Sequence, residues 1–239
     1  MTARTRGPWR MLRALRRAQS GIAMTEFALS LPILLTLGLT GLEVAWLTLA
    51  HLRVSNIAMM TADNASRVRD SIDEGDVTEL FLGGSLAGSA MDFANHGRII
   101  LYSIEPTPTG GNQWIRWQRC TGSKSTAPSY GRPRTAAGAA ITNGTEIYNS
   151  DRTTLNTATP SSPAHTSAQA AAYGPAGNQI AAQSGTAVML AEVVYDYQPL
   201  LAGNLLGPIE IRRVSAFNVR QRTNQSINNA AHVTPASCG

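Results

Sequence analysis

Two carboxylates lie in or beside a long apolar stretch of the sequence. Glu26 precedes Phe27 at the start of this stretch, and Glu43 is the only formally charged residue from Phe27 to Ala50. A carboxylate so close to hydrocarbon is costly unless it is paired, and residues that persist in such places are usually functional. The two lie roughly 25 Å apart along a helix and on different faces, so they do not form a catalytic pair.

Other residues capable of chemistry are sparse. Cys120 and Cys238 are the only cysteines, and we predict that they form one disulfide closing a long loop, with two unpaired thiols as the alternative. The histidines show no metal-ligand spacing with these cysteines, so we predict neither a metal site nor a cofactor. They are His51, His96, His165 and His232.

Known catalytic motifs are missing from the sequence. There is no Gly-x-Ser-x-Gly elbow and no His-Glu-x-x-His, and the Gly83-Gly84 pair lacks the lysine of a phosphate-binding loop. We therefore predict a protein that is not an enzyme. A signal-anchored periplasmic enzyme or binding module is the alternative.

The charges and the apolar stretch together indicate a membrane anchor. The 24 residues from Phe27 to Ala50 are long enough to cross a bilayer as a helix. Arginine before this run keeps the amino terminus in the cytoplasm, so we predict that the remainder is exported. Without the leader arginines the chain has 14 basic and 15 acidic residues, which gives no reason to expect nucleic-acid binding. These arginines are Arg4, Arg6, Arg10, Arg13, Arg16 and Arg17.

The boundary between the basic and apolar segments resembles a type IV prepilin cleavage site. It reads Ser-Gly-Ile-Ala-Met-Thr-Glu-Phe over residues 20–27, and the Glu-aromatic pair is similar to that of Tad-type (tight adherence) pilins. This resemblance implies that a prepilin peptidase cuts between Gly21 and Ile22. Gly21 lacks a Cβ, so its backbone can enter a peptidase cleft that bulkier residues would block.

Cleavage at this position would bring a new charge close to Glu26. The freed amine of Ile22 would lie one helical turn from the Glu26 carboxylate, which could pair with it or with the amine of a neighbouring subunit. Alternatively, Glu26 simply marks the membrane interface. Glu43 also has two open roles: contact with a partner subunit, or a position at the far interface beside Trp46.

The resemblance extends along the apolar stretch. Glu26-Phe27-Ala28-Leu29 followed by Leu31-Pro32 is similar to the TadE family of minor pilins or pseudopilins. Two later segments, the Gln-Arg-Cys ending at Cys120 and the stretch 192–199, resemble TadE-like proteins more loosely. The family implies a component of Tad-type pilus assembly in the bacterial inner membrane, with other pilins or pseudopilins as partners.

The helical pattern continues beyond the membrane. Apolar residues recur at three- and four-residue spacing to about Val68, which predicts one helix over 22–70 with its second half on a soluble domain. Gly38, Gly41 and Ala45 leave a narrow strip for a neighbouring helix. A second helix is predicted from about Val77 to Asn95.

The exported part, 71–239, is predicted to be α+β with an antiparallel sheet. Strands are expected in two hairpins, the first formed by 98–105 and 113–120 and the second by 188–197 and 209–220. The small polar residues of 121–186 predict a largely irregular insertion. The whole chain therefore consists of a leader (1–21), a long helix (22–70) that spans the membrane at about 27–50, and the exported domain.

Details of these strands predict how they are buried. Alternation in the third strand indicates that one of its faces is buried, and the irregular pattern at Arg212 and Arg213 suggests a bulge in the fourth. Alternating Trp and Arg in 114–120 would also suit stacking on nucleic-acid bases. In an exported domain we favour a structural role, with Arg116 and Arg119 at the rim of the sheet.

Overall fold

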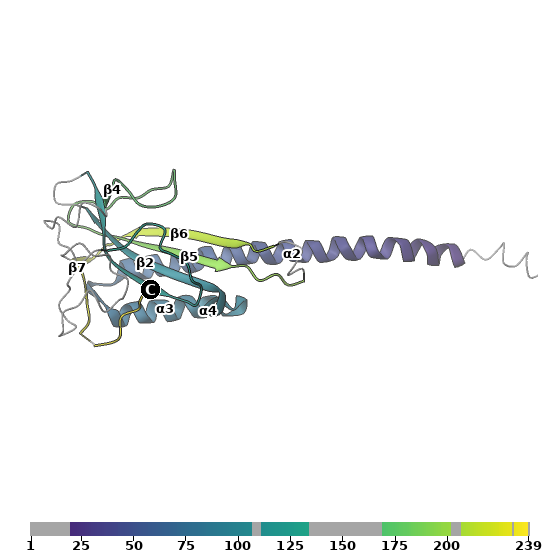
Figure 1. Ribbon diagram of the computed structural model, residues 1–239, viewed down its shortest axis with the longest axis horizontal. Helices are drawn as coiled ribbons and strands as arrows, with labels where there is room; N and C mark the ends of the chain where they lie inside the picture. The colour runs from purple at the N-terminus through teal and green to yellow at the C-terminus, as the bar shows by residue number, and fades with distance from the viewer. Residues whose placement is uncertain (1–19, 107–110, 134–168, 202–206, 231, 239) are drawn as a thin grey trace, which may run out of the picture.

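The computed structural model describes residues 20–106, 111–133, 169–201, 207–230 and 232–238. One long helix carries a small α+β domain along the half nearer its carboxyl end, while its other half projects away from that domain (Figure 1). This confirms the predicted fold class. Apart from Ser20 and Gly21, the predicted leader lies outside the described residues.

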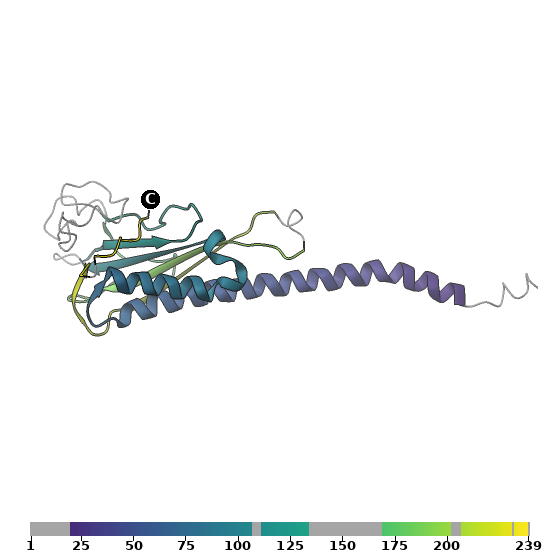
Figure 2. The same ribbon diagram turned by 90° about the horizontal axis from the view of Figure 1, so that it is seen from below.

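Helix α2 (Ser20–Arg67) is continuous over 48 residues. Side chains from 21 to 42 are exposed, and the helix is first covered by the domain at Glu43. Beyond this point a stripe at helical spacing is buried, and it comprises Ala50, Val54, Ile57, Ala58, Ala62 and Ala65. Pro32 lies in the exposed part, where Figure 2 shows the helix bending, as the loss of one backbone donor favours.

The second predicted helix is shorter than expected. Strand β1 (Asp70–Asp73) leads into α3 (Glu74–Ala87), whose first turn is closed by a capping box between Asp73 and Asp76. A 3-10 turn, η1 (Ser89–Met91), and the short α4 (Phe93–His96) replace the rest. The chain turns at Gly88, where a Cβ would lie 2.4 Å from that of Phe93, so the glycine allows Phe93 to fold back into the core.

Five strands form the main sheet in the order β4-β3-β2-β5-β6. All its pairings are antiparallel, and the two predicted hairpins, β2·β3 and β5·β6, are joined by pairing between β2 and β5. A separate parallel pair joins β1 to β7. The bounds are β2 (Gly97–Pro106), β3 (Gln113–Thr121), β4 (Gln169–Ala170), β5 (Val188–Asp196), β6 (Glu210–Asn218) and β7 (Arg222–Asn228).

The predicted bulge at Arg212 and Arg213 is wrong. Strand β6 pairs with β5 in continuous register from Glu210 to Asn218, and the irregularity lies between β2 and β3 at Ser103 and Ile104. Arg212 and Arg213 lie on opposite faces of the sheet, and each has a polar partner on its own face. Arg213 Nη2 lies 2.9 Å from His51 Nδ1 on the helix side, whereas Arg212 bonds to a carboxylate on the other side.

Strand β5 is buried on both faces, which corrects the prediction of a half-buried strand. One face, including Ala191, packs against α2 and α4. Figure 2 shows the helices on this side of the sheet. The other face, including Leu190, is covered by residues near Tyr130 and Tyr173 and by the chain end at Cys238. The described flanks of the predicted irregular insertion therefore pack on the sheet, whereas 134–168 lie outside the described residues.

A disulfide fastens the carboxyl end of the chain to this second face. Cys120 at the end of β3 and Cys238 are bonded, with their sulfurs 2.11 Å apart and a sequence separation of 118. Arg98 donates to the Cys238 carbonyl at 2.5 Å, which gives the same segment a second attachment. Of the two alternatives left open by the sequence, the structure has the bonded cysteines.

Arg119 is fully buried, which corrects its predicted place at the rim. It lies on β3 with no exposed side-chain surface and forms an ion pair with Glu74, whose side chain is 1% exposed. The Arg119 Nε lies 2.8 Å from each Glu74 carboxylate oxygen. Both charges are out of water, where their mutual attraction is strong, and the pair joins the first turn of α3 to the sheet.

Glu74→Gln tests this ion pair. The substitution takes the carboxylate charge away from the buried Arg119 guanidinium, and we expect the free energy of unfolding to fall by about 3 to 5 kcal/mol. The measurement is urea denaturation of the full chain in detergent. Glu79→Gln is the matched control, because Glu79 is exposed on the same helix and should change stability by about 0.5 kcal/mol or less. Equal losses in both variants would contradict the role assigned to the pair.

Candidate functional site

Four of the five residues predicted to act in processing and assembly lie together at the free end of α2, and the fifth, Glu43, lies where the helix meets the domain. Gly21, Ile22, Glu26 and Phe27 occupy its first two turns, and all four are exposed. Ile22 is 59% exposed and Phe27 is 61% exposed, so neither side chain is used in packing the domain. A Cβ built on Gly21 would meet no atom within 4 Å, so nothing in the described fold requires glycine there.

The hydroxyl side chains on the exposed part of α2 donate hydrogen bonds to backbone carbonyls of the same helix. Thr36 Oγ1 donates to the Pro32 carbonyl at 3.0 Å, and Thr40 Oγ1 donates to the Thr36 carbonyl at 2.8 Å. Thr25 and Ser30 donate in the same way to carbonyls three residues earlier. Such bonds let hydroxyl side chains lie in lipid without an unpaired donor.

Glu26 has no such partner. Of the polar side chains from 22 to 42, it alone makes no hydrogen bond or ion pair with any residue that the structure describes. It lies four residues, about 6 Å along the axis, beyond Ile22. A charge at Ile22 would therefore be on the same side of the helix and one turn away.

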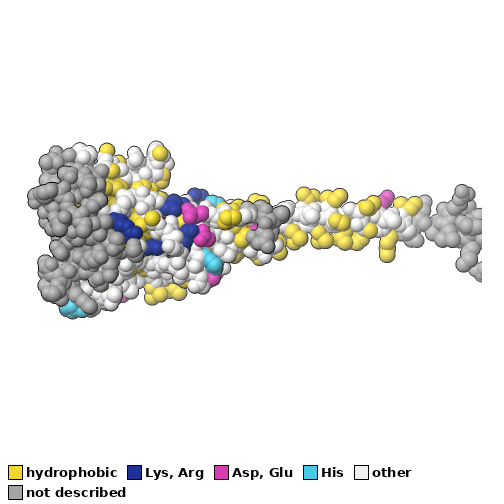
Figure 3. Space-filling view, in the orientation of Figure 1, with side chains coloured by type: hydrophobic (Ala, Val, Ile, Leu, Met, Phe, Trp, Pro, Cys, Tyr) yellow, Lys and Arg dark blue, Asp and Glu magenta, His cyan; other side chains and the backbone are white. Residues whose placement is uncertain are grey.

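The rest of this helix surface is apolar. Figure 3 shows hydrophobic side chains along the whole projecting part of the molecule. By length and composition α2 can cross a membrane, and among the described residues it is the one helix that meets this criterion. Gly38 and Gly41 have open space where a Cβ would be, so the helix backbone can be approached closely at these two positions.

Glu43 lies where this apolar surface ends, and it is hydrogen-bonded to residues of the domain. Its side chain is largely buried, and Tyr197 Oη donates to its carboxylate at 2.7 Å. The backbone N–H groups of Leu200 and Leu201 donate to the same carboxylate at 3.3 and 3.1 Å. The role predicted for Glu43 in assembly therefore stays a prediction, and the observed role is to hold the loop after β5 against α2.

Trp46 adds a second connection to this loop one turn further along. Its indole Nε1 donates to the Gln198 carbonyl at 3.2 Å, and the Arg53 guanidinium lies 5.5 Å from the centroid of its ring. The sequence offers no local signal for these contacts, since more than 150 residues separate the two segments. The junction is the set of residues that connect α2 to this loop, namely Glu43, Trp46, Tyr197, Gln198, Leu200 and Leu201.

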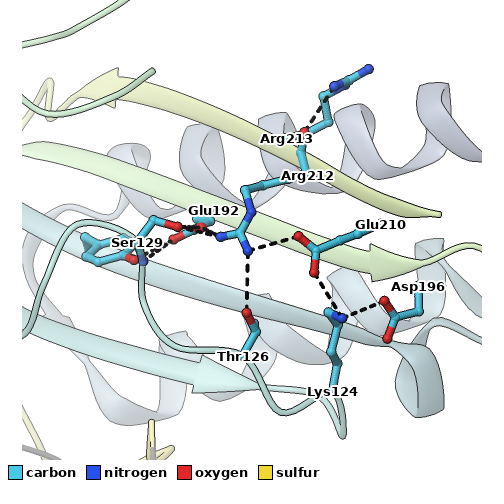
Figure 4. Close-up of polar contacts among 9 residues, drawn as sticks. Lys124, Thr126, Ser129, Glu192, Asp196, Glu210, Arg212 and Arg213 are labelled. Atoms are coloured by element: carbon cyan, nitrogen blue, oxygen red, sulfur yellow. Dashed lines mark hydrogen bonds and ion pairs between the residues drawn. The ribbon is translucent and has the colours of Figure 1, made fainter. Parts of the chain in front are cut away.

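The sequence patterns also did not predict a polar network, which lies on the face of the sheet opposite α2 (Figure 4). At its centre Glu192 of β5 is fully buried and accepts hydrogen bonds from Tyr102 at 2.6 Å, from Ser129, and from Arg212 of β6. Arg212 reaches Glu210 at 3.1 Å, and Lys124 bridges Glu210 and Asp196. These contacts attach the segment after β3 to β5 and β6.

The electrostatics of this network fit a structural role. Burial and the charge of Glu192 raise the pKa of the Tyr102 hydroxyl, so this group stays protonated and donates to the carboxylate. Burial alone would raise the pKa of Glu210, but hydrogen bonds from Lys124 and Arg212 lower it. In the folded protein the Tyr102 hydroxyl therefore keeps its proton as a donor, and the Glu210 carboxylate remains a charged acceptor.

Neither a metal site nor a stacking surface is formed in the described part of the chain. There, no group of three or more His, Cys, Asp or Glu side chains lies close enough together to hold an ion. Trp114 and Trp117 are 2% and 0% exposed, so their rings are not available to nucleic-acid bases. Arg116 lies 5.1 Å from the centroid of the Trp114 ring.

A long exposed apolar helix that carries a small α+β domain is the plan of a membrane-anchored protein. Residues 21–63 match the model of the family described as TadE-like protein. This match covers most of α2 and confirms the resemblance noted in the sequence, so the chain has the anchoring segment of a component associated with Tad pili. No curated protein and no solved structure matches the chain.

The junction can be tested with a double-mutant cycle on Tyr197→Phe and Glu43→Gln. A buried hydrogen bond to a charged group contributes roughly 1.5 to 3 kcal/mol, so we expect the two losses of unfolding free energy to be non-additive by about this amount. Denaturation of the two single variants and the double variant in detergent gives the coupling directly. Losses that add to within about 0.5 kcal/mol would contradict a direct bond.

Proposed function

We propose that this protein is a minor pilin or pseudopilin of a Tad-type pilus assembly or secretion system, and that it is not an enzyme. It is inserted in the bacterial inner membrane with its amino terminus in the cytoplasm and its α+β domain in the periplasm. A prepilin peptidase cleaves it between Gly21 and Ile22. The mature chain then associates with other pilins or pseudopilins of the same system through the exposed part of α2.

The unpartnered carboxylate of Glu26 is the observation that carries this proposal. Threonine and serine hydroxyls on the exposed helix bond to their own backbone, and Glu43 is bonded by Tyr197, but Glu26 has no described partner. A lone charge near hydrocarbon is costly until it finds an opposite charge. The amine released at Ile22 supplies one, in the same chain or in a neighbouring subunit.

Access to the cleavage site is consistent with the exposed end of the helix. No described residue of the domain lies against Gly21, so a peptidase at the membrane surface meets no obstruction from the domain. The partner helices would be other pilins, which can approach closely along Gly38 and Gly41. Phe27, exposed beside Glu26, would pack against the same neighbour.

Gly21→Val tests processing. A branched side chain at the scissile position should slow cleavage by roughly tenfold or more, since a loss of about 1.4 kcal/mol in transition-state contacts is sufficient. Mass spectrometry of the amino terminus, with and without the peptidase, measures the outcome. For the unaltered chain we expect Ile22 as the first residue only when the peptidase is present.

Gly38→Val is the matched control, because its surroundings are as open as those of Gly21 but it lies far from the cleavage site. This variant should be processed normally. Retention of residues 1–21 in the unaltered chain with active peptidase would refute cleavage and favour the signal-anchored enzyme or binding module.

Glu26→Ala tests the pairing role separately from processing. If the carboxylate pairs with an amine in the membrane, we expect a variant that is still cleaved but assembles about tenfold less well, corresponding to about 1.4 kcal/mol. Co-purification with the other pilins of the system measures assembly. Thr25→Val is the matched control, because the Thr25 hydroxyl bonds within its own helix at 2.8 Å. Normal assembly of the Glu26→Ala variant would remove the pairing role.

A further inference from the structure

The loop after β5 brings apolar side chains to the place where α2 emerges from the domain. From Tyr197 to Leu201 the chain runs alongside α2, on the side of the domain facing the exposed helix (Figures 1 and 2). Leu200 and Leu201 are each 51% exposed, although they lie next to the buried Glu43. The loop thus presents two leucines beside an apolar helix surface.

The loop is prepared for an apolar environment, because several of its backbone polar groups are already paired. The N–H groups of Leu200 and Leu201 both donate to Glu43, and the Gln198 carbonyl accepts from Trp46. Exposed backbone polar groups are what normally keep loops out of lipid. Here side chains of α2 are hydrogen-bonded to three backbone groups of the loop, and the leucine side chains remain exposed for contact with lipid.

The length of the exposed helix places this loop at the surface of a bilayer. Ile22 to Leu42 is 21 residues, or about 31 Å of helix, and the hydrocarbon core of a bilayer is about 30 Å thick. If Ile22 lies at the cytoplasmic edge of the hydrocarbon, Leu42 lies at the periplasmic edge. Trp46 follows one turn later, at the level where tryptophan is enriched in membrane proteins.

The geometry points to the segment Tyr197–Leu201 as a second membrane contact, with Leu200 and Leu201 immersed in the periplasmic surface of the lipid bilayer. The hydrocarbon-spanning segment then ends at Leu42 rather than at Ala50, because Glu43, Trp46 and Ala50 are covered by the domain. Contact at both helix and loop sets the orientation of the domain relative to the membrane. This inference rests on the proposed insertion of α2 in the membrane.

Fluorophores at three positions of the full chain test this placement. Both native cysteines are in the disulfide, so Leu201→Cys, Ile33→Cys and Leu82→Cys each introduce one reactive thiol. Ile33 is 62% exposed near the middle of the helix segment, and Leu82 is 61% exposed on α3. Gly84 on α3 lies beside Ile57, roughly 21 Å past Glu43 along the helix axis, so position 82 serves as a matched apolar control outside the membrane.

Each labelled variant is reconstituted in phosphatidylcholine–phosphatidylglycerol vesicles that contain lipids spin-labelled at a shallow or a deep position of the acyl chain. We expect the shallow label to quench position 201 several-fold more than position 82, and to quench it more than the deep label does. Position 33 should be quenched most by the deep label. These vesicles contain no other pilin, so a partner protein cannot account for quenching at position 201.

Two results would overturn the inference while the membrane helix stands. One is quenching at position 201 no greater than at position 82, with position 33 quenched normally. The other is quenching at position 201 that matches the depth profile of position 33, which would place the loop in the bilayer interior. Lack of quenching at position 33 would instead show that α2 is not inserted, and both the inference and the proposed function would fail.

Discussion

A single continuous helix has to serve two environments, and the rest of the structure follows from this constraint. The amino-terminal part of α2 exposes apolar side chains up to Leu42, while the part beyond Glu43 buries an apolar stripe against the sheet. In water the first part would be unfavourable, because contiguous apolar surface of this extent is normally covered. The helix therefore requires a second apolar environment in addition to the core of its own domain.

The domain is built to hold this helix rigidly. Both faces of its sheet are covered, one by α2 and α3 and the other by the segments around Tyr130 and Tyr173. Each covering layer is fastened by charges or a covalent bond: Arg119 with Glu74 on the helix side, and the Glu192 network and the disulfide on the other.

Local patterns predicted the long helix and the two hairpins, but not strands β1, β4 and β7 or the contacts between distant segments. Apolar spacing predicted α2 and the strand pairs, because period and turn residues are local properties. It could not show that β5 is covered twice, since the second covering layer comes from polar segments such as that around Ser129. The partners of Arg119 and Glu43 are 45 and more than 150 residues away. The sequence pattern therefore indicated the rim of the sheet for Arg119, and a partner subunit or the membrane interface for Glu43. The break at Gly88 was missed because it depends on where Phe93 packs.

The two carboxylates of the exposed helix and its junction differ in whether they already have hydrogen-bond partners. At the domain end, Glu43 has its charge compensated by Tyr197 and two backbone donors, so a partner subunit at that level would have to displace contacts that already exist. At the free end, Glu26 has no described partner to displace. An amine that pairs with Glu26 therefore gains the full energy of the pair. At Glu43 it would gain only the energy of the new pair minus that of the hydrogen bonds it displaces. Under the proposed function, the amino-terminal end of the helix is therefore the end that offers an unpaired carboxylate to other subunits, whereas the junction holds the loop after β5 against α2.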